Sequence, residues 1–74
     1  MAQVERTRFP DSTAVRAIRY CAGRQALEVT FASGGVYVYH GVPREVFARF
    51  KSAESAGGFL HREILDRYRY TRVG

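Results

Sequence analysis

No stretch of this sequence approaches the roughly 20 apolar residues that a membrane-spanning helix needs. The first eight residues, Met1 to Arg8, are polar and charged, where a signal peptide would need an apolar run. We therefore expect a cytoplasmic protein with no membrane partner.

The chain is also poor in cysteine and histidine. Its one cysteine, Cys21, excludes an internal disulfide and agrees with a reducing compartment. His40 and His61 have no companion Cys or carboxylate at a spacing typical of metal ligands, such as Cys-x-x-Cys. We therefore expect no metal and no cofactor.

Little in the sequence supports catalysis. Cys21 is expected at a strand end, without the helix start or glycine-flanked elbow that activates nucleophiles. A pairing of Cys21 with His40 across the sheet is an alternative, but it would also need an orienting group and a pocket that so short a chain scarcely encloses. We predict that the chain is not an enzyme.

What the sequence does contain is material for one small, basic domain. Its 74 residues are 46% hydrophobic, with five Phe and five Tyr, which indicates one folded core. Such a core supplies about 3–5 kcal/mol of net stability, so a homodimer or another partner would help to hold it. Twelve Lys and Arg against seven Asp and Glu give a net charge of +5, which favours polyanionic partners. The alternative is a coding bias, since eleven of the twelve cations are Arg.

The first half of the chain reads as strands. Residues 1–11 show no consistent period and are interpreted as a flexible N-terminal lead, with a single domain over 12–73. Alternation of β-branched or aromatic with polar residues predicts three antiparallel strands, at 15–21, 26–32 and 36–40. Turns are expected at 22–25 and at Ser33-Gly34-Gly35.

The second half reads as helices. Pro43 suits a first helical turn, and Val46, Phe47 and Phe50 recur at helical spacing. Ser55 is expected to cap a second helix that runs to about Asp66, with Phe59, Leu60 and Ile64 inward. The resulting fold class is α+β: a three-stranded antiparallel meander with two short helices packed on one face. The C-terminal segment, residues 67–73, would be an edge strand or a tail.

Turn length decides which side chains share a face of the sheet. In the first hairpin, the register that sets Tyr20 opposite Leu27 and Ile18 opposite Val29 assembles an apolar face. In the second, a two-residue Ser33-Gly34 turn would direct Tyr37 and Tyr39 away from that face, whereas a three-residue Ser33-Gly34-Gly35 loop would direct both into the core. We favour the two-residue turn, because every aliphatic side chain of the three strands then lies on the side that the helices cover.

In the favoured register, Tyr37 and Tyr39 are available to stack on unpaired bases, with Arg19 near them. Their alternative role is that of good strand formers that simply pack. In the C-terminal stretch, guanidinium groups interleave with aromatic rings, a combination that can contact phosphates and bases, or else forms an amphipathic edge strand with Tyr68 and Tyr70 packed inward. The arginines concerned are Arg67, Arg69 and Arg72.

A weaker candidate site precedes the second helix. Backbone N–H groups near Gly57 and Gly58, with Arg62 one turn on, have the elements of an anion-binding site. The alternative is structural: the glycines permit a chain reversal and a close approach of neighbouring elements.

Several short motifs, taken in order, resemble the KTSC domain, a family named for the C-terminal extension of some lysyl-tRNA synthetases and also found as small bacterial proteins. The motifs are Ser12, Ile18-Arg19-Tyr20, Leu27 to Phe31, Gly34 to Tyr39, Gly41-Val42-Pro43, Ala53 to Gly57 and Ile64 to Tyr70. The most diagnostic are the central Tyr-x-Tyr, the Gly-Val-Pro after it and the Ala-x-Ser-x-Gly segment. Leu60-His61-Arg62 departs from the family, whose members often carry an aromatic residue and an asparagine there.

Through its link to a tRNA-handling enzyme, the resemblance implies RNA binding. Together with the charge and the aromatic residues, it predicts a non-catalytic module that binds RNA or single-stranded nucleic acid. The alternative is a protein–protein or self-association module, in which the tyrosines and an exposed strand edge form the interface.

Overall fold

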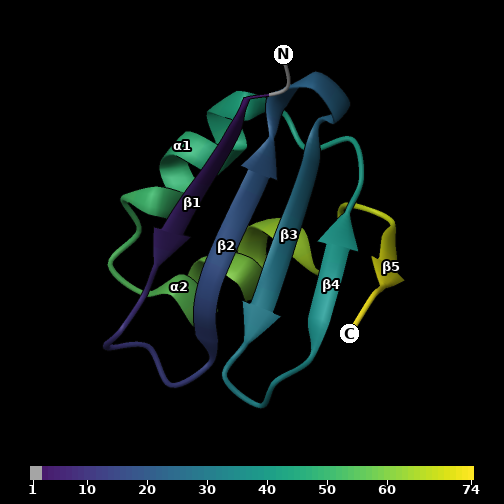
Figure 1. The fold of residues 1–74 in the computed structure, drawn as a ribbon. Coiled ribbons are helices and arrows are strands. Elements are labelled where there is room, and N and C mark those ends of the chain that lie inside the picture. Colours follow the sequence, from purple (N-terminus) through teal and green to yellow (C-terminus); the bar gives the residue numbers. More distant parts are fainter. Residues whose placement is uncertain (1–2) are drawn as a thin grey trace.

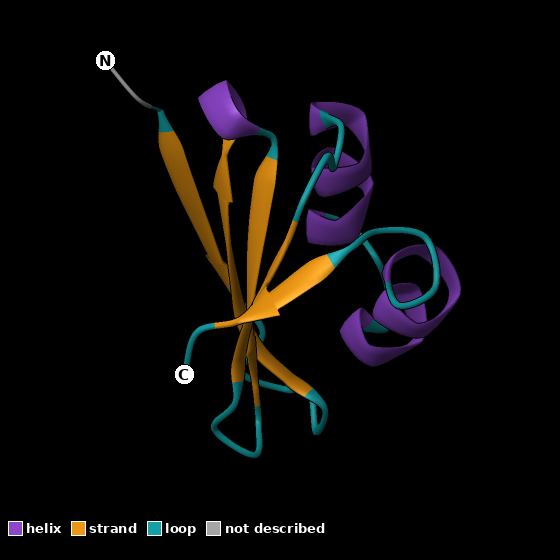
Figure 2. Ribbon diagram, turned by 90° about the vertical axis from the view of Figure 1, so that its right-hand side faces the viewer, coloured by secondary structure: helices purple, strands orange, loops and turns teal. Residues whose placement is uncertain are grey.

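In the computed structural model, which describes residues 3–74, the chain forms an antiparallel meander of five strands with its helices on one face (Figure 1). The strand order follows the sequence, so β1 and β5 are the two edges. The strands are β1 (Val4–Arg8), β2 (Val15–Cys21), β3 (Ala26–Phe31), β4 (Val36–Tyr39) and β5 (Tyr70–Arg72). Figure 2 shows the sheet from its edge, with both helical segments on the same side.

The α+β class and the covering of one face by helices are confirmed, but the prediction of three strands is wrong. β1 arises from the segment that we interpreted as a flexible lead, and it pairs along β2, with Thr7 opposite Ile18. Its inward side chains are polar, so the segment lacks the apolar alternation by which strands are recognised. Met1 and Ala2 of that lead lie outside the described residues. The C-terminal segment forms the edge strand β5, paired with β4, as one of the two interpretations had it.

The first hairpin has the predicted register, with Tyr20 opposite Leu27 and Ile18 opposite Val29. A short turn, η1 (Ala22–Arg24), joins its strands, and Gln25 closes it with a φ of 50°. The four-residue connection keeps all these apolar side chains on the helix side, where they are buried.

The register that we favoured for the second hairpin is wrong. The loop is three residues long, Ala32 to Gly34, because the Phe31 N–H donates to the Gly35 carbonyl at 2.8 Å. Gly34 has a φ of 107°, a conformation that glycine adopts without strain. The pairing then sets Val29 opposite Tyr37 and Leu27 opposite Tyr39, so both tyrosines point to the helix side of the sheet.

The helices begin where the sequence predicts. α1 (Arg44–Lys51) follows Pro43 and buries Val46, Phe47 and Phe50 against the sheet. α2 (Ala56–Phe59) starts at Ser55, whose Oγ accepts a hydrogen bond from the Gly58 N–H at 3.0 Å, and it continues as the π-helical turn η2 (Leu60–Ile64). Among the described residues, no helix has the length and apolar character to cross a membrane.

Tyr20 joins the sheet to the chain that enters α1. Its ring stacks on Phe47 with centroids 4.8 Å apart, and its hydroxyl donates to the Val42 carbonyl at 2.6 Å. Tyr20 is only 1% exposed and Val42 is fully buried, so water cannot replace this hydrogen bond.

We therefore predict that Tyr20→Phe lowers the free energy of unfolding by about 1–3 kcal/mol, because it leaves the buried Val42 carbonyl without a donor. Urea denaturation followed by circular dichroism measures the change. Tyr70→Phe is the matched control, since the Tyr70 ring is exposed, and it should be nearly neutral. Equal stability of the two variants would contradict the role given to Tyr20.

Candidate functional site

An aromatic groove lies on the helix side of the sheet, over β4 and β5. Its volume is about 490 Å³. It is lined by Phe31, Ser33, Gly35, Tyr37, Tyr39, Leu65, Tyr70 and Arg72. Its residues come from three neighbouring strands, from the β3–β4 loop and from the chain just after η2.

Antiparallel pairing brings the rings of the aromatic groove together. Tyr39 is opposite Tyr70 and Tyr37 is opposite Arg72, so all four side chains share the helix side. The Tyr70 ring lies 5.3 Å from the Tyr37 ring and 5.8 Å from the Tyr39 ring, centroid to centroid. Phe31 meets Tyr37 edge to face at 5.4 Å, so the four rings form one continuous cluster.

The rings of the cluster differ in exposure. Tyr39 is 2% exposed and belongs to the core, and Tyr37 is half-buried. Tyr70, by contrast, is 58% exposed, because β5 is the edge strand and no helix lies over it. The expectation that Tyr37 and Tyr39 present their rings on an open sheet face is wrong, and Tyr70 is the accessible ring. The sequence signal for Tyr70 was the alternation of Arg with Tyr, and one interpretation of it was an edge strand with Tyr68 and Tyr70 packed inward. Tyr70 does lie on the helix side of the edge strand, but it is not buried there.

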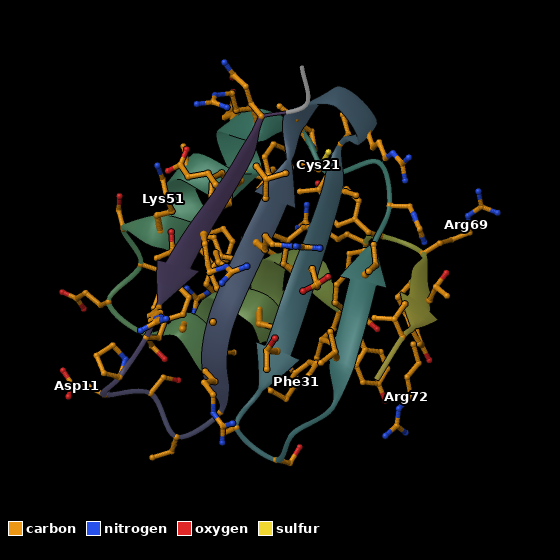
Figure 3. All side chains as sticks on the ribbon, viewed as in Figure 1. Asp11, Cys21, Phe31, Lys51, Arg69 and Arg72 are labelled. Carbon is orange, nitrogen blue, oxygen red and sulfur yellow. The ribbon has the colours of Figure 1, made fainter. Side chains whose placement is uncertain are left out.

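Three C-terminal arginines lie at or near β5. The Arg72 guanidinium carbon lies 5.6 Å from the centre of the Tyr37 ring, close enough for a cation–π interaction. Arg67 and Arg69 are exposed and line a shallow hollow of about 430 Å³ that shares Leu65 and Tyr70 with the aromatic groove. In Figure 3, the Arg69 and Arg72 side chains extend outward beside β5.

Arg19 does not belong to this group. It lies on the opposite face of the sheet, where its guanidinium forms an ion pair with Glu28 at 3.1 Å. The structure therefore brings Tyr37, Tyr39 and Arg72 together and separates Arg19 from them. Sequence reasoning placed Arg19 with the tyrosines because it assigned β4 the opposite facing.

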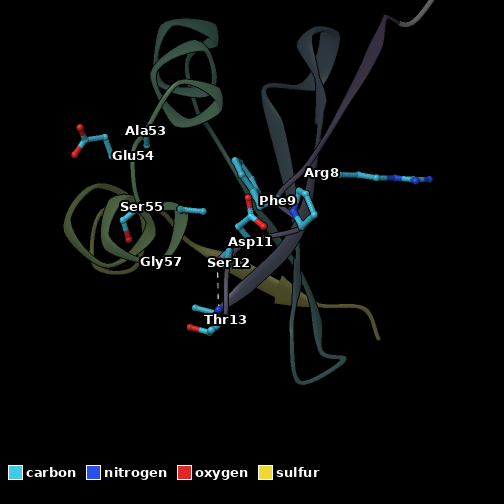
Figure 4. Close-up of a pocket in the computed structure, with 12 residues that line it drawn as sticks. Arg8, Phe9, Asp11, Ser12, Thr13, Ala53, Glu54, Ser55 and Gly57 are labelled. Atoms are coloured by element: carbon cyan, nitrogen blue, oxygen red, sulfur yellow. Dashed lines mark hydrogen bonds between the residues drawn. The ribbon is translucent and has the colours of Figure 1, made fainter.

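A second hollow, of about 380 Å³, lies between the β1–β2 connection and the start of α2 (Figure 4). Two of its serines are engaged in local structure: the Ser12 Oγ accepts from the Val15 N–H at 3.1 Å, and the Ser55 Oγ accepts from the Gly58 N–H. A Cβ at Gly57 would lie 2.9 Å from the Cβ of Ala14, so this glycine permits a close approach of two chain segments. The Gly58 N–H already donates to Ser55. Both glycines thus have structural roles, and anion binding by Gly57, Gly58 and Arg62 stays a prediction.

The histidine and cysteine side chains form no cluster suited to metal binding in the described part of the chain, where no three His, Cys, Asp or Glu residues gather as ligands. The His40 Nε2 is 2.9 Å from the Thr71 Oγ1, a hydrogen bond that ties β5 to the end of β4. Cys21 is half-buried at the end of β2.

Comparison with known proteins identifies the family. The family model of the KTSC domain, compared by sequence, matches residues 11–68 of this chain. The chain belongs to the KTSC family. A crystal structure of a KTSC domain protein from Yersinia pestis has the same fold, with a TM-score of 0.89 and 29% identity over 97% of this chain and 100% of that chain.

Other KTSC relatives are of two kinds. A protein of Tsukamurella paurometabola is 37% identical over 59 residues, which cover 80% of this chain and 88% of the relative. A protein of Stutzerimonas stutzeri is 36% identical over 63 residues, covering 84% of this chain and 89% of the relative. A lysine–tRNA ligase of Nostoc sp. is 31% identical over 64 residues, or 86% of this chain, but this chain spans only 11% of that enzyme.

Backbone conformation, hydrogen bonding and packing account for several residues that carry the KTSC resemblance. Gly41 has a φ of 75°, Val42 is fully buried, and Pro43 leads into α1. Ser12 and Ser55 accept backbone hydrogen bonds, and Tyr39 is in the core. Tyr37 is the diagnostic residue that also lines the aromatic groove while remaining partly exposed.

Burial also changes the pKa of a tyrosine phenol that lines the groove. Desolvation by burial raises the pKa of Tyr39, with smaller contributions in the same direction from Tyr37 and Tyr70. Burial likewise raises the pKa of Tyr20. Because a raised folded-state pKa favours the neutral phenol, this contribution to stability is present at neutral pH and is lost as the pH rises through the folded pKa.

We predict that the KTSC domain loses stability as the pH rises above about 10, and that Tyr39→Phe loses less over the same range because it cannot ionise there. Urea denaturation at a series of alkaline pH values measures both slopes. An unchanged slope in Tyr39→Phe would show that this phenol is not held neutral by the fold.

Proposed function

We propose that this KTSC domain is a non-catalytic module that binds single-stranded nucleic acid, RNA above all, at the aromatic groove. A base stacks on Tyr70, and the arginines around that ring contact the neighbouring phosphates. Tyr37 and Tyr39 support the platform from below and do not themselves carry the exposed stacking surface.

The observation that carries the proposal is the exposed Tyr70 ring, which packs against two neighbouring rings and shares its groove with Arg72. An aromatic side chain of 58% exposure in a domain this small is a prominent apolar surface. A ring supported by Tyr37 and Tyr39 gives up little freedom when a base stacks on it. Arg72 lies at one end of the same groove, where a phosphate attached to that base can reach it.

Charge and family relationship support the same reading. The chain carries a net charge of +5, and three of its arginines lie at or near β5. A related segment forms part of a lysine–tRNA ligase, an enzyme that acts on an RNA. Attached to such an enzyme, a small basic domain would add contacts to the same substrate.

A protein interface is the second candidate, because β5 is an edge strand that another extended chain could extend by pairing. Two features disfavour it. β5 has only three residues, and arginines lie at and just before it, which protects an edge against strand addition.

The central prediction concerns Tyr70. We expect Tyr70→Ala to weaken binding of a fluorescein-labelled 12-nucleotide oligouridine by roughly 5- to 150-fold, because stacking on one base contributes about 1–3 kcal/mol. Tyr70→Phe keeps the ring and loses only the hydroxyl, so it should bind within about threefold of the wild type. Fluorescence anisotropy at low salt measures the affinities, and circular dichroism checks that each variant is folded.

Salt dependence separates nucleic acid from a protein partner. Each phosphate contact contributes a slope of about −0.7 to log affinity against log salt for a single strand, so Arg72→Gln should make the slope shallower by about that amount. No binding of the oligouridine at low salt, or equal binding by Tyr70→Ala and the wild type, would refute the proposal.

A further inference from the structure

The face of the sheet opposite the helices carries a second, basic surface. This open face is turned toward the viewer in Figure 1, with no helix covering it. On it lies a depression of about 230 Å³ that we call the basic depression. It is lined by Arg6, Arg8, Ala17, Ile18, Arg19, Glu28 and Thr30.

The sheet register concentrates like charge in this depression. Arg6 lies directly opposite Arg19 across β1 and β2, and Arg8 is opposite Ala17. Like charges in directly opposite positions destabilise a sheet. Glu28 is the one carboxylate that lines the depression, and it pairs with Arg19. Within residues 3–74, Arg6 and Arg8 form no ion pair at all.

The floor of the basic depression leaves room for an anion. Ala17 is opposite Thr30 in the β2–β3 pair, and both side chains are short, whereas the arginines around them are long. A group seated there would meet guanidinium donors from two strands, an arrangement that matches the geometry of a phosphate.

The spacing along β1 favours a chain of phosphates over an isolated anion. Arg6 and Arg8 are two residues apart on one strand face, which separates their backbones by about 7 Å. Successive phosphates of an extended nucleic-acid strand are separated by a similar distance. No helix covers this face, so a nucleic-acid strand has room to lie along β1 (Figure 1).

We propose that the basic depression binds the phosphate backbone of nucleic acid, through Arg6, Arg8 and Arg19, without contact to the bases. The choice of nucleic acid as the source of the phosphates rests on the proposed function of the aromatic groove. The two surfaces are separate, since they lie on opposite faces and at opposite edges of the sheet. The groove selects unpaired bases, and the depression adds affinity for any sequence.

The test uses two probes: the labelled oligouridine, and a labelled strand of the same length in which every nucleotide is abasic. Arg6→Gln with Arg8→Gln should weaken binding of both probes by at least about tenfold at low salt and make the salt slope shallower by about 1.4, the value for two lost phosphate contacts. The control is Arg24→Gln with Arg49→Gln, which removes the same charge from exposed positions outside the depression and should change both affinities far less.

Glu28→Gln tests the same surface in the opposite direction. It removes the carboxylate that pairs with Arg19, so it should tighten binding of both probes by up to about fivefold, the size of a modest surface ion-pair effect. Tyr70→Ala should leave the abasic probe unaffected, so the groove and the depression are judged separately.

Three results would overturn the inference. The first is equal loss of affinity in the Arg6/Arg8 and Arg24/Arg49 variants, which would reduce the effect to net charge. The second is weaker binding after Glu28→Gln. The third is binding of phosphatidylglycerol vesicles, but of neither strand, that depends on Arg6 and Arg8, which would assign the depression to a membrane surface. A failure of Tyr70→Ala to affect the oligouridine refutes the groove alone.

Discussion

The loop between β3 and β4 decides what the rest of the molecule can do. Gly34 takes a positive φ that closes a three-residue turn, and the length of that turn sets which way every side chain of β4 points. Tyr37 and Tyr39 consequently face the helices, and Val36 and Val38 face away from them. Because side chains at paired positions of neighbouring strands point to the same face, Tyr70 and Arg72 of β5 lie on the same side as Tyr39 and Tyr37 and reach the aromatic groove. A turn shorter by one residue would have exchanged the two faces.

How far the sequence predicts such a fold depends on whether an alternative register is costly. In the first hairpin, the competing register would set Arg19 against Leu27 in the core, so the apolar pattern specifies the pairing. In the second hairpin, one register buries two valines of β4 and the other buries two tyrosines. Both sets of side chains suit a core, so the apolar pattern alone does not specify the register. Large rings fill the space beneath the helices better than valines do, and tyrosine can keep its hydroxyl near the solvent at the groove.

The edge strand β1 escaped prediction for a related physical reason. β1 turns Glu5 and Thr7 toward the helix side, and Glu5 pairs there with Lys51 of α1. Polar residues therefore occupy the inward positions that are usually apolar in a strand. Phe9, the apolar residue just beyond β1, stacks on Phe50 with centroids 5.7 Å apart and anchors the connection. An edge strand needs only one paired neighbour and one anchor, and neither leaves a periodic signal. The helices were predictable because Pro43 and Ser55 mark their starts and their inward residues repeat.

The two surfaces of the domain differ in what they cost the fold, and this difference bears on their roles. The aromatic groove is continuous with the core, because Tyr39 is buried and Tyr37 packs on Phe31, so its rings stabilise the domain even without a ligand. The basic depression does the opposite, since Arg6 lies directly opposite Arg19 and like charges in such positions destabilise a sheet. A domain with only about 3–5 kcal/mol of net stability has little reserve for such repulsion. An anion bound between the guanidinium groups would convert that repulsion into attraction, which gives the arrangement a physical purpose that packing does not supply.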